Sequence, residues 1–236
     1  MNFGRIIEKF WDPRYIRRRK RVARQVLHGS GIEIGALYKP LPVAAGVKVA
    51  YVDRMSVQQL RLQYPELASE NLVPVDVVDD GERLETFADN SQDFVIANHF
   101  LEHTQDPIGT LKAHLRIVKP GGVLYLAVPN RDATFDKDRP LTKWDHLKRD
   151  HLEGPAGSYK GHLREYACLV EHLNGQALED RIEELAETQY SIHFHVWNEI
   201  EFRAFLDCAR SEFNIAYEVE YFDHLHFEIL AVLRKK

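Results

Sequence analysis

The stretch Gly31-Ile32-Glu33-Ile34-Gly35-Ala36-Leu37-Tyr38-Lys39-Pro40 decides the fold that this sequence predicts. Ile32 and Ile34 lie in a short apolar run around one acid, which is typical of a buried strand. Gly35 follows where such a strand has to turn, and it permits a sharp bend and the close approach of a ligand because it has no Cβ. In a doubly wound α/β sheet, ligands bind at the carboxyl ends of the strands. We therefore expect this stretch to form the first strand and the turn that faces the ligand.

Strand patterns alternate with helical patterns along the next hundred or so residues. Apolar or β-rich runs follow at residues 47–53, 72–78, 93–98 and 123–129. Helical spacing separates them, notably after Ser56 and after Asp106-Pro107. This alternation predicts βαβ units and a mainly parallel sheet.

The end of the chain predicts a different pairing. The runs 213–222 and 226–233 are joined by only a few residues, which indicates an antiparallel hairpin. The expected fold class is α/β, a Rossmann-like doubly wound, mainly parallel sheet with a C-terminal antiparallel hairpin. A helical insertion is expected after strand five.

Length and composition predict one cytoplasmic domain spanning residues 1–236. A chain of 236 residues with 44 % hydrophobic residues can bury a single core. No apolar run approaches the ~20 residues that cross a bilayer, and the N-terminus lacks the apolar core of a secretory signal. The two cysteines, Cys168 and Cys208, indicate free thiols rather than a disulfide framework.

The charge is unevenly distributed. A net charge of −5 argues against a surface that binds nucleic acid as a whole, so no nucleic-acid partner is expected. Residues 1–28 are expected to form a basic helical segment that carries the run Arg17-Arg18-Arg19-Lys20-Arg21. Two interpretations stay open: the run contacts an anionic membrane surface or phosphates, or it is the solvated face of a helix. Nothing in the pattern indicates an oligomeric state.

The turn after the first strand lacks a phosphate-binding loop. A dinucleotide normally requires G-x-G-x-x-G at this position, so that backbone amides can enclose the pyrophosphate. This sequence keeps only Gly35, and the next glycine is Gly46. The pattern weighs against NAD, FAD and nucleoside triphosphates.

Acidic residues stand where a nucleoside would bind. Glu33 lies beside the turn, Asp53 ends the second strand and Asp76 lies near the end of the third. A carboxylate at the end of the second strand suits hydrogen bonds to ribose hydroxyls. S-adenosylmethionine carries an ammonium and a sulfonium but no phosphate, which matches an acidic mouth without a phosphate loop. The alternative is that these acids form turns and cap helices.

Residues 31–129 resemble the core of class I S-adenosylmethionine-dependent methyltransferases. The resemblance is closest to the type-11-like group, many of whose members are encoded with glycosyltransferases. Four segments carry it in the family's order: Glu33-Ile34-Gly35-Ala36 as the first motif, Tyr51-Val52-Asp53-Arg54 as the ribose-binding acidic loop, Asn98-His99-Phe100-Leu101-Glu102-His103-Thr104-Gln105-Asp106-Pro107 as the motif after strand four, and Val118-Lys119-Pro120-Gly121-Gly122 as the loop before strand five. The later glycines of the first motif are missing, which leaves open how the methionine tail is held.

The resemblance implies S-adenosyl-L-methionine as the cofactor. It places Asp53 at the ribose, Met55 on the adenine and Asp76 near the adenine amino group, and it places Asn98 and His99 at the reacting end. His103 would either line the cofactor site or only hold its loop. The expected cofactor-binding set is Glu33, Gly35, Ala36, Asp53, Arg54, Met55, Asp76, Val77, Asn98, His99 and His103.

Residues 131–195 are expected to form a lid and an acceptor pocket. Transfer to a hydroxyl benefits from a base, and histidine suits that role near neutral pH. Alternation along 191–197 would turn His193, His195 and Trp197 toward the mouth, where Trp197 could stack on a sugar. The expected catalytic residues are His99, His193 and His195, and the expected acceptor contacts are Trp197, His146 and His151. No thiol or carboxylate stands at metal spacing from these histidines, so no metal site is expected.

The expected function is methyl transfer from S-adenosylmethionine to a small-molecule or glycan acceptor, with O-methylation preferred. One alternative is a catalytically silent protein of the same fold that binds a partner through its basic N-terminal segment. Another is a nicotinamide-dependent Rossmann enzyme, which the missing glycines disfavour.

Overall fold

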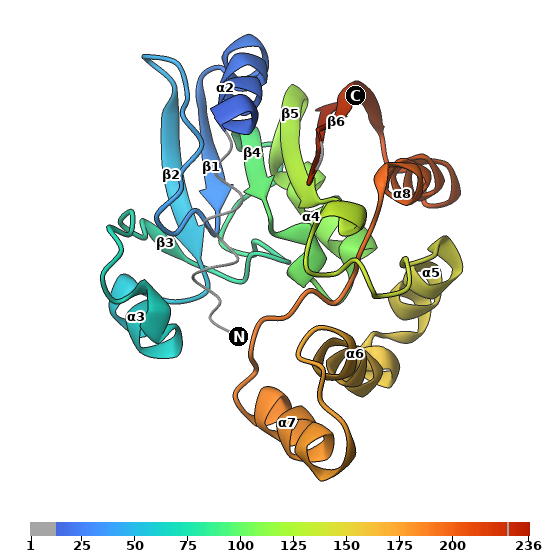
Figure 1. Cartoon of the computed structure of the whole chain (residues 1–236). Helices are drawn as coiled ribbons and strands as arrows, with labels where there is room; N and C mark the ends of the chain where they lie inside the picture. The colour runs from blue at the N-terminus through green and yellow to red at the C-terminus, as the bar shows by residue number, and fades with distance from the viewer. Residues whose placement is uncertain (1–12, 226) are drawn as a thin grey trace.

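The computed structural model describes residues 13–225 and 227–236, and a seven-stranded sheet forms its centre (Figure 1). The strands lie in the order β3-β2-β1-β4-β5-β7-β6. Their bounds are β1 Ser30–Ile34, β2 Lys48–Asp53, β3 Val77–Val78, β4 Gln92–Asn98, β5 Val118–Pro129, β6 Tyr217–Leu225 and β7 Glu228–Lys235. Strands β1 to β5 pair in parallel, whereas β7 pairs antiparallel with both β5 and β6. The expected fold class is confirmed.

Seven α-helices are described. Helices α2 (Pro13–Val26), α4 (Pro107–Ile117) and α8 (Glu199–Glu212) pack on the sheet, and α3 (Val57–Gln63) follows β2. The segment between β5 and α8 contains α5 (Trp144–Glu153), α6 (Ala156–Leu169) and α7 (Gly175–Glu187), and α6 and α7 lie beyond the ends of the strands (Figure 1). Single 3₁₀ turns occur at η1 Pro65–Leu67, η2 Leu101–His103 and η3 Arg131–Ala133.

Both faces of the sheet are covered, as expected for a doubly wound sheet. Along β4, Phe94 and Ile96 pack with the residues of α2, whereas Val95 and Ala97 pack with those of α4 and α8. The alternation follows from the strand geometry, which turns successive side chains to opposite faces. Between them, helices α6 and α7 bury a small core of their own, which includes Leu163 and Phe194.

Helix starts follow the local chemistry of the sequence. Ser56 caps α3 in a capping box with Gln59, and Asp106 caps α4 by accepting from the Gly109 N–H at 2.9 Å. Of the predicted helical segment 1–28, the structure describes α2 and the residues after it, and residues 1–12 lie outside the described residues. Among the described helices, none is long and apolar enough to span a membrane.

Candidate active site

A cavity of about 470 Å³ opens at the carboxyl ends of the central strands. Its volume lies in the range of about 300–1,000 Å³ that is usual for small-molecule sites. Of the expected cofactor set, Glu33, Gly35, Ala36, Asp53, Arg54, Asn98, His99 and His103 line it, and Met55, Asp76 and Val77 do not.

The turn after β1 is built around Gly35. This residue has φ 62°, a left-handed conformation that glycine adopts without strain, and its N–H donates to Val52 O at 2.9 Å. Glu33 closes the same loop, because both its carboxylate oxygens accept from the Leu41 N–H, at 2.9 and 3.0 Å. Burial raises the pKa of Glu33 to about 7. The residues of this turn, 35–42, all line the cavity.

Asp53 presents the carboxylate at the end of β2. Its side chain lines the cavity, and burial raises its pKa even though the backbone N–H groups of Arg54 and Met55 act in the opposite direction. A partly buried carboxylate in this position is suited to hydroxyl donors on a ligand.

Met55 and Asp76, which were predicted to contact the adenine, do not line the cavity. Asp76 is exposed and accepts from the Tyr51 N–H at 2.8 Å, and it lies just before β3, which comprises only Val77 and Val78 of the predicted run 72–78. The carboxyl end of β3 is therefore Val78, and the loop after it brings Asp80, Gly81 and Glu82 to the cavity.

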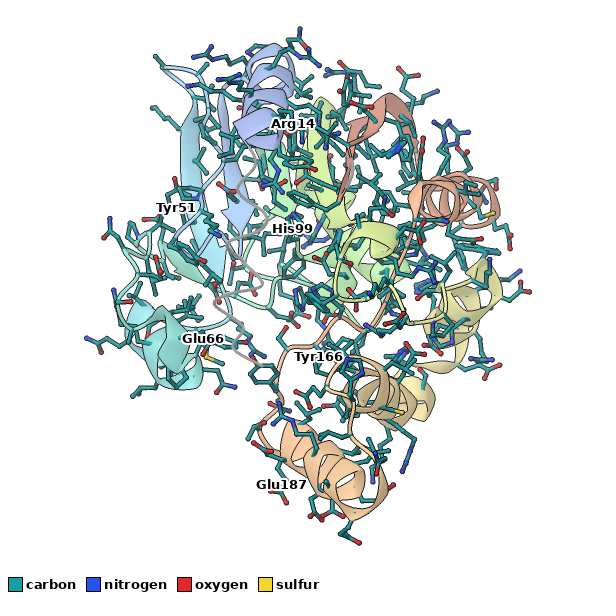
Figure 2. The ribbon with its side chains drawn as sticks, viewed as in Figure 1. Arg14, Tyr51, Glu66, His99, Tyr166 and Glu187 are labelled. Carbon is teal, nitrogen blue, oxygen red and sulfur yellow. The ribbon has the colours of Figure 1, made fainter. Side chains whose placement is uncertain are left out.

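His99, which is labelled in Figure 2, belongs to a cluster of charged side chains. His99 Nε2 lies 3.3 Å from a Glu228 carboxylate oxygen, and Nδ1 lies 3.5 Å from Glu102. Burial would lower the pKa of His99, but these two carboxylates more than offset it and the pKa is raised. Glu228 also binds Arg18, at 2.8 Å, and Arg19.

The basic run of α2 is therefore not a continuous outward face. Arg18 is buried and Arg19 points into the cavity, whereas Arg17 and Arg21 are exposed. Of the five cations in the run 17–21, Arg18 and Arg19 form ion pairs with Glu228 and are therefore not available to a membrane surface.

His103 holds the loop at the cavity wall. Its Nδ1 lies 2.9 Å from Ile192 O and 3.0 Å from Ser191 Oγ. Burial lowers its pKa to about 4, so the imidazole is neutral near pH 7.

His193 faces the cavity beside a buried acid. Its Nδ1 lies 2.6 Å from Asp136 Oδ2, and the other oxygen of Asp136 accepts from Arg139 Nη1 at 2.8 Å. Among the described residues, no hydrogen-bond partner is found for Nε2 of His193. Burial would raise the pKa of Asp136, but His193 and Arg139 lower it, which keeps this group a carboxylate.

The predicted alternation along 191–197 is wrong. The N–H groups of Phe194 and His195 both donate to Glu102 O, at 2.7 and 3.2 Å, so the segment is not a regular strand. His195 is fully buried away from the cavity. Trp197 is also fully buried and stacks on Phe205 at 5.8 Å, so its indole offers no surface to a sugar.

The two remaining predicted acceptor contacts do not line the cavity either. His151 Nδ1 lies 2.8 Å from the Asp106 carboxylate that caps α4. His146 lies beside His162 and His195 in a separate cluster.

The sequence profile of the methyltransferase domain family matches residues 12–184. The chain belongs to this family. The protein is a methyltransferase, and its cofactor is S-adenosylmethionine. The silent scaffold and the nicotinamide enzyme are therefore set aside. No curated protein matches the sequence.

Several solved structures are similar to this methyltransferase. A Rhodobacter sphaeroides protein named as a Zn-dependent alcohol dehydrogenase is 14 % identical, with a TM-score of 0.52 and coverage of 89 % of this chain and 85 % of that one. A SAM-dependent methyltransferase from Aquifex aeolicus is 14 % identical, with a TM-score of 0.46 and coverage of 94 % and 98 %. One from Methanosarcina mazei is 17 % identical, with a TM-score of 0.45 and coverage of 89 % and 93 %.

The cavity of the methyltransferase fits this cofactor. Within the described residues, a Cβ at Gly35 would meet nothing nearer than 3.8 Å, which leaves room for a ligand above the turn, and Asp53 offers its carboxylate to a ribose. When bound, S-adenosylmethionine supplies a methyl group on a cationic sulfur, which needs no phosphate loop.

Several cavity residues were not predicted. They include Tyr15, Arg19, Glu82, Phe135, Tyr190 and Glu228. Glu228 had a visible signal, because it is an acid inside an apolar strand pattern and a basic run elsewhere in the chain could neutralise it. The others had none, since loops and a helix distant in sequence bring them to the strand ends.

Proposed function

We propose that this methyltransferase transfers its methyl group to a hydroxyl of a small-molecule or glycan acceptor, with His193 as the base. One observation carries the proposal: His193 stands on the cavity wall with Nδ1 2.6 Å from the buried carboxylate of Asp136.

The pair is suited to removing a proton. Methyl transfer is an in-line displacement, so alignment of the acceptor supplies much of the rate enhancement. A hydroxyl acceptor must also lose its proton, and Nε2 of His193 is free to take it. Asp136 would fix Nδ1–H, hold the ring orientation and stabilise the imidazolium that forms.

His99 is less suited to act as the base. Glu102 and Glu228 favour its protonated form, so it has no lone pair to offer a hydroxyl while it binds them both. We assign it a positioning role beneath the reacting groups.

Two aromatic residues that line the cavity, Phe135 and Tyr190, favour an acceptor that contains a ring. Phe135 lies beside His193, with ring centroids 4.8 Å apart, and Tyr190 lines the same cavity. Burial raises the pKa of Tyr190 to about 12, so it stays a neutral phenol that can stack on a ring or donate a hydrogen bond. Both residues belong to the segment 131–195, which would then act as the lid and acceptor pocket.

The test compares His193→Ala and Asp136→Asn with His172→Ala, which removes an exposed histidine. We would measure S-adenosylhomocysteine release with a panel of saccharides, phenols and amines, and the affinity for S-adenosylhomocysteine by calorimetry. Turnover should occur with hydroxyl acceptors and fall about 10²- to 10⁴-fold in His193→Ala, with affinity within about twofold of wild type. Full activity of His193→Ala, or turnover of amines alone, would contradict the proposal.

A further inference from the structure

Four potential metal ligands converge between the helices of the 131–195 segment. His146 and Asp150 lie one turn apart on α5, His162 lies on α6, and His195 lies on the segment before α8. His146 Nε2 is 3.1 Å from His162 Nε2 and 3.2 Å from Asp150 Oδ2, and His162 Nε2 is 4.0 Å from the same oxygen. The three histidines each offer one nitrogen within 4.8 Å of the others.

Within the described residues, one nitrogen of this cluster has no hydrogen-bond partner. Nδ1 of His195 is buried and has no hydrogen-bond partner within the described part of the chain, while Nε2 lies 3.5 Å from Gln105 O. The side chains of His195 and Asp150 are almost wholly inaccessible, and an orphaned buried nitrogen is costly. Nδ1 is thus the nitrogen of His195 that is left for a ligand.

Part of the spacing matches a tetrahedral metal centre, whereas His162 Nε2 and Asp150 Oδ2, 4.0 Å apart, would have to approach each other. Bonds of about 2.0–2.1 Å from zinc to histidine or carboxylate ligands place neighbouring ligand atoms roughly 3.3 Å apart. Two of the measured separations, 3.1 and 3.2 Å, are already close to that value. Three imidazoles with one carboxylate form a donor set typical of zinc and similar divalent metals.

We propose that His146, Asp150, His162 and His195 bind a zinc-type divalent metal ion. The carboxylate that the sequence analysis did not find at metal spacing is Asp150. Ser158 Oγ donates to Asp150 Oδ2 at 2.6 Å and orients the carboxylate, as partners beyond the ligands do in metal sites. Arg149 donates to Nδ1 of His146 at 2.8 Å, which puts the ring proton on Nε2. Metal at Nε2 would move that proton to Nδ1 and release Arg149 from His146; the exposed Arg149 side chain also lies 3.9 Å from Asp150 Oδ1.

The site is structural rather than catalytic. None of the four ligands lines the cavity, and four protein ligands leave a tetrahedral ion no open position. The ion would join α5 and α6 to the segment that carries His193, two residues before His195. It would therefore fix the wall on which the proposed base stands, without taking part in the transfer.

A second group of potential ligands, Glu102, His103 and His193, is less suited to a metal. Nδ1 of His103 already lies 2.9 Å from Ile192 O, and Nδ1 of His193 lies 2.6 Å from Asp136. Metal binding at this second group is the alternative that the test has to distinguish.

The experiment uses the untagged full chain, stripped of metal by a chelator and dialysed. Co²⁺ is titrated in and followed by visible absorption, and Zn²⁺ is then added as competitor. We expect about one Co²⁺ per chain with the strong absorption of a tetrahedral site, its displacement by Zn²⁺, and a higher Tm with either metal.

The matched variants are His162→Ala and Asp150→Ala, with His172→Ala as the exposed control and His193→Ala for the second group. The first two should lose the tetrahedral spectrum and the Tm shift, and the last two should keep both. Because a truncation at the cluster can impair folding, His146→Asn serves as a milder variant with the same expected loss. A wild-type chain without the tetrahedral Co²⁺ spectrum, or binding that is lost only in His193→Ala, would overturn the proposal.

Discussion

Glu228 lines the cavity and contacts three basic side chains. Its carboxylate is 1 % exposed and is bound by Arg18 and Arg19 from α2 and by His99 after β4. Burial would raise the pKa of Glu228, but Arg19 and His99 outweigh that effect and hold the pKa far below its usual value. The residue therefore ties the N-terminal helix to the site as a charge that has to stay paired.

Replacing Glu228 by glutamine should be strongly destabilising. The change leaves the guanidinium of Arg19 without its anion and that of Arg18 with Asp223 alone, at 3.5 Å, and breaking a buried pair in this way costs about 3–5 kcal/mol. The free energy of unfolding, measured with urea, gives the loss directly. Glu220→Gln is the matched control, because its ion pair with Arg234 is 35 % exposed and is worth about 1 kcal/mol or less. Equal stability of the two variants would show that Glu228 does not hold α2.

Single residues were predicted well where the backbone dictates them. The bend at Gly35 and the acid at Asp53 follow from the end of a strand, which is readable in sequence. Trp197 and His195 were wrongly placed at the mouth because alternation assumes a regular strand. The two adjacent N–H groups that share Glu102 O break that regularity, and nothing in residues 191–197 signals it.

At the scale of elements, α4 supports the loop after β3. His114 Nε2–H donates to Gly81 O at 2.8 Å from the buried face of the helix. Gly81 itself has no room for a side chain, since a Cβ would lie 2.7 Å from the Phe100 ring. The helix and the glycine together place Asp80 and Glu82 at the cavity.

This support should make the stability depend on pH. Burial lowers the pKa of His114 from 6.5 to about 4 in the folded chain. The unfolded chain therefore binds more protons between these values, and stability is complete above the unfolded pKa and is lost as the pH falls toward about 4. His114→Gln keeps a hydrogen-bond donor but cannot be protonated. As the pH falls toward about 4, its free energy of unfolding should therefore decrease less than that of wild type, and the two losses should differ by up to about 3 kcal/mol.

Urea unfolding at several pH values between about 7 and 4 measures the difference. His172→Gln, an exposed position, provides the comparison. Parallel pH profiles for His114→Gln and wild type would mean that another group controls acid unfolding.

The secondary-structure elements were predicted better than the contacts that they make with distant parts of the chain. The caps at Ser56 and Asp106 and the terminal hairpin were readable because their signals are local. The role of α2 was not, because Arg18 and Arg19 meet Glu228 about 210 positions away in the chain. Strand β3 was predicted too long, as 72–78 instead of Val77–Val78, because an apolar run does not show which of its residues pair.

At the scale of the whole molecule, the strand order places the cavity. The chain proceeds from β1 to β2 in one direction and later returns to β4 on the other side of β1. The carboxyl ends of β1 and β4 thus form a switch point, where α/β sheets bind their ligands. This could be predicted from the βαβ pattern, whereas the acceptor wall could not, because it consists of loops and helices from the 131–195 segment.

The central claim is that the cofactor lies at this switch point with its ribose at Asp53. Calorimetric titration of S-adenosylhomocysteine into Asp53→Ala tests it most directly, beside wild type and Asp76→Ala, whose carboxylate binds the Tyr51 N–H outside the cavity. We predict that Asp53→Ala binds about 10- to 100-fold more weakly, the loss expected for hydrogen bonds to a charged group, while Asp76→Ala stays close to wild type. Unchanged affinity in Asp53→Ala, or a loss confined to Asp76→Ala, would contradict the account.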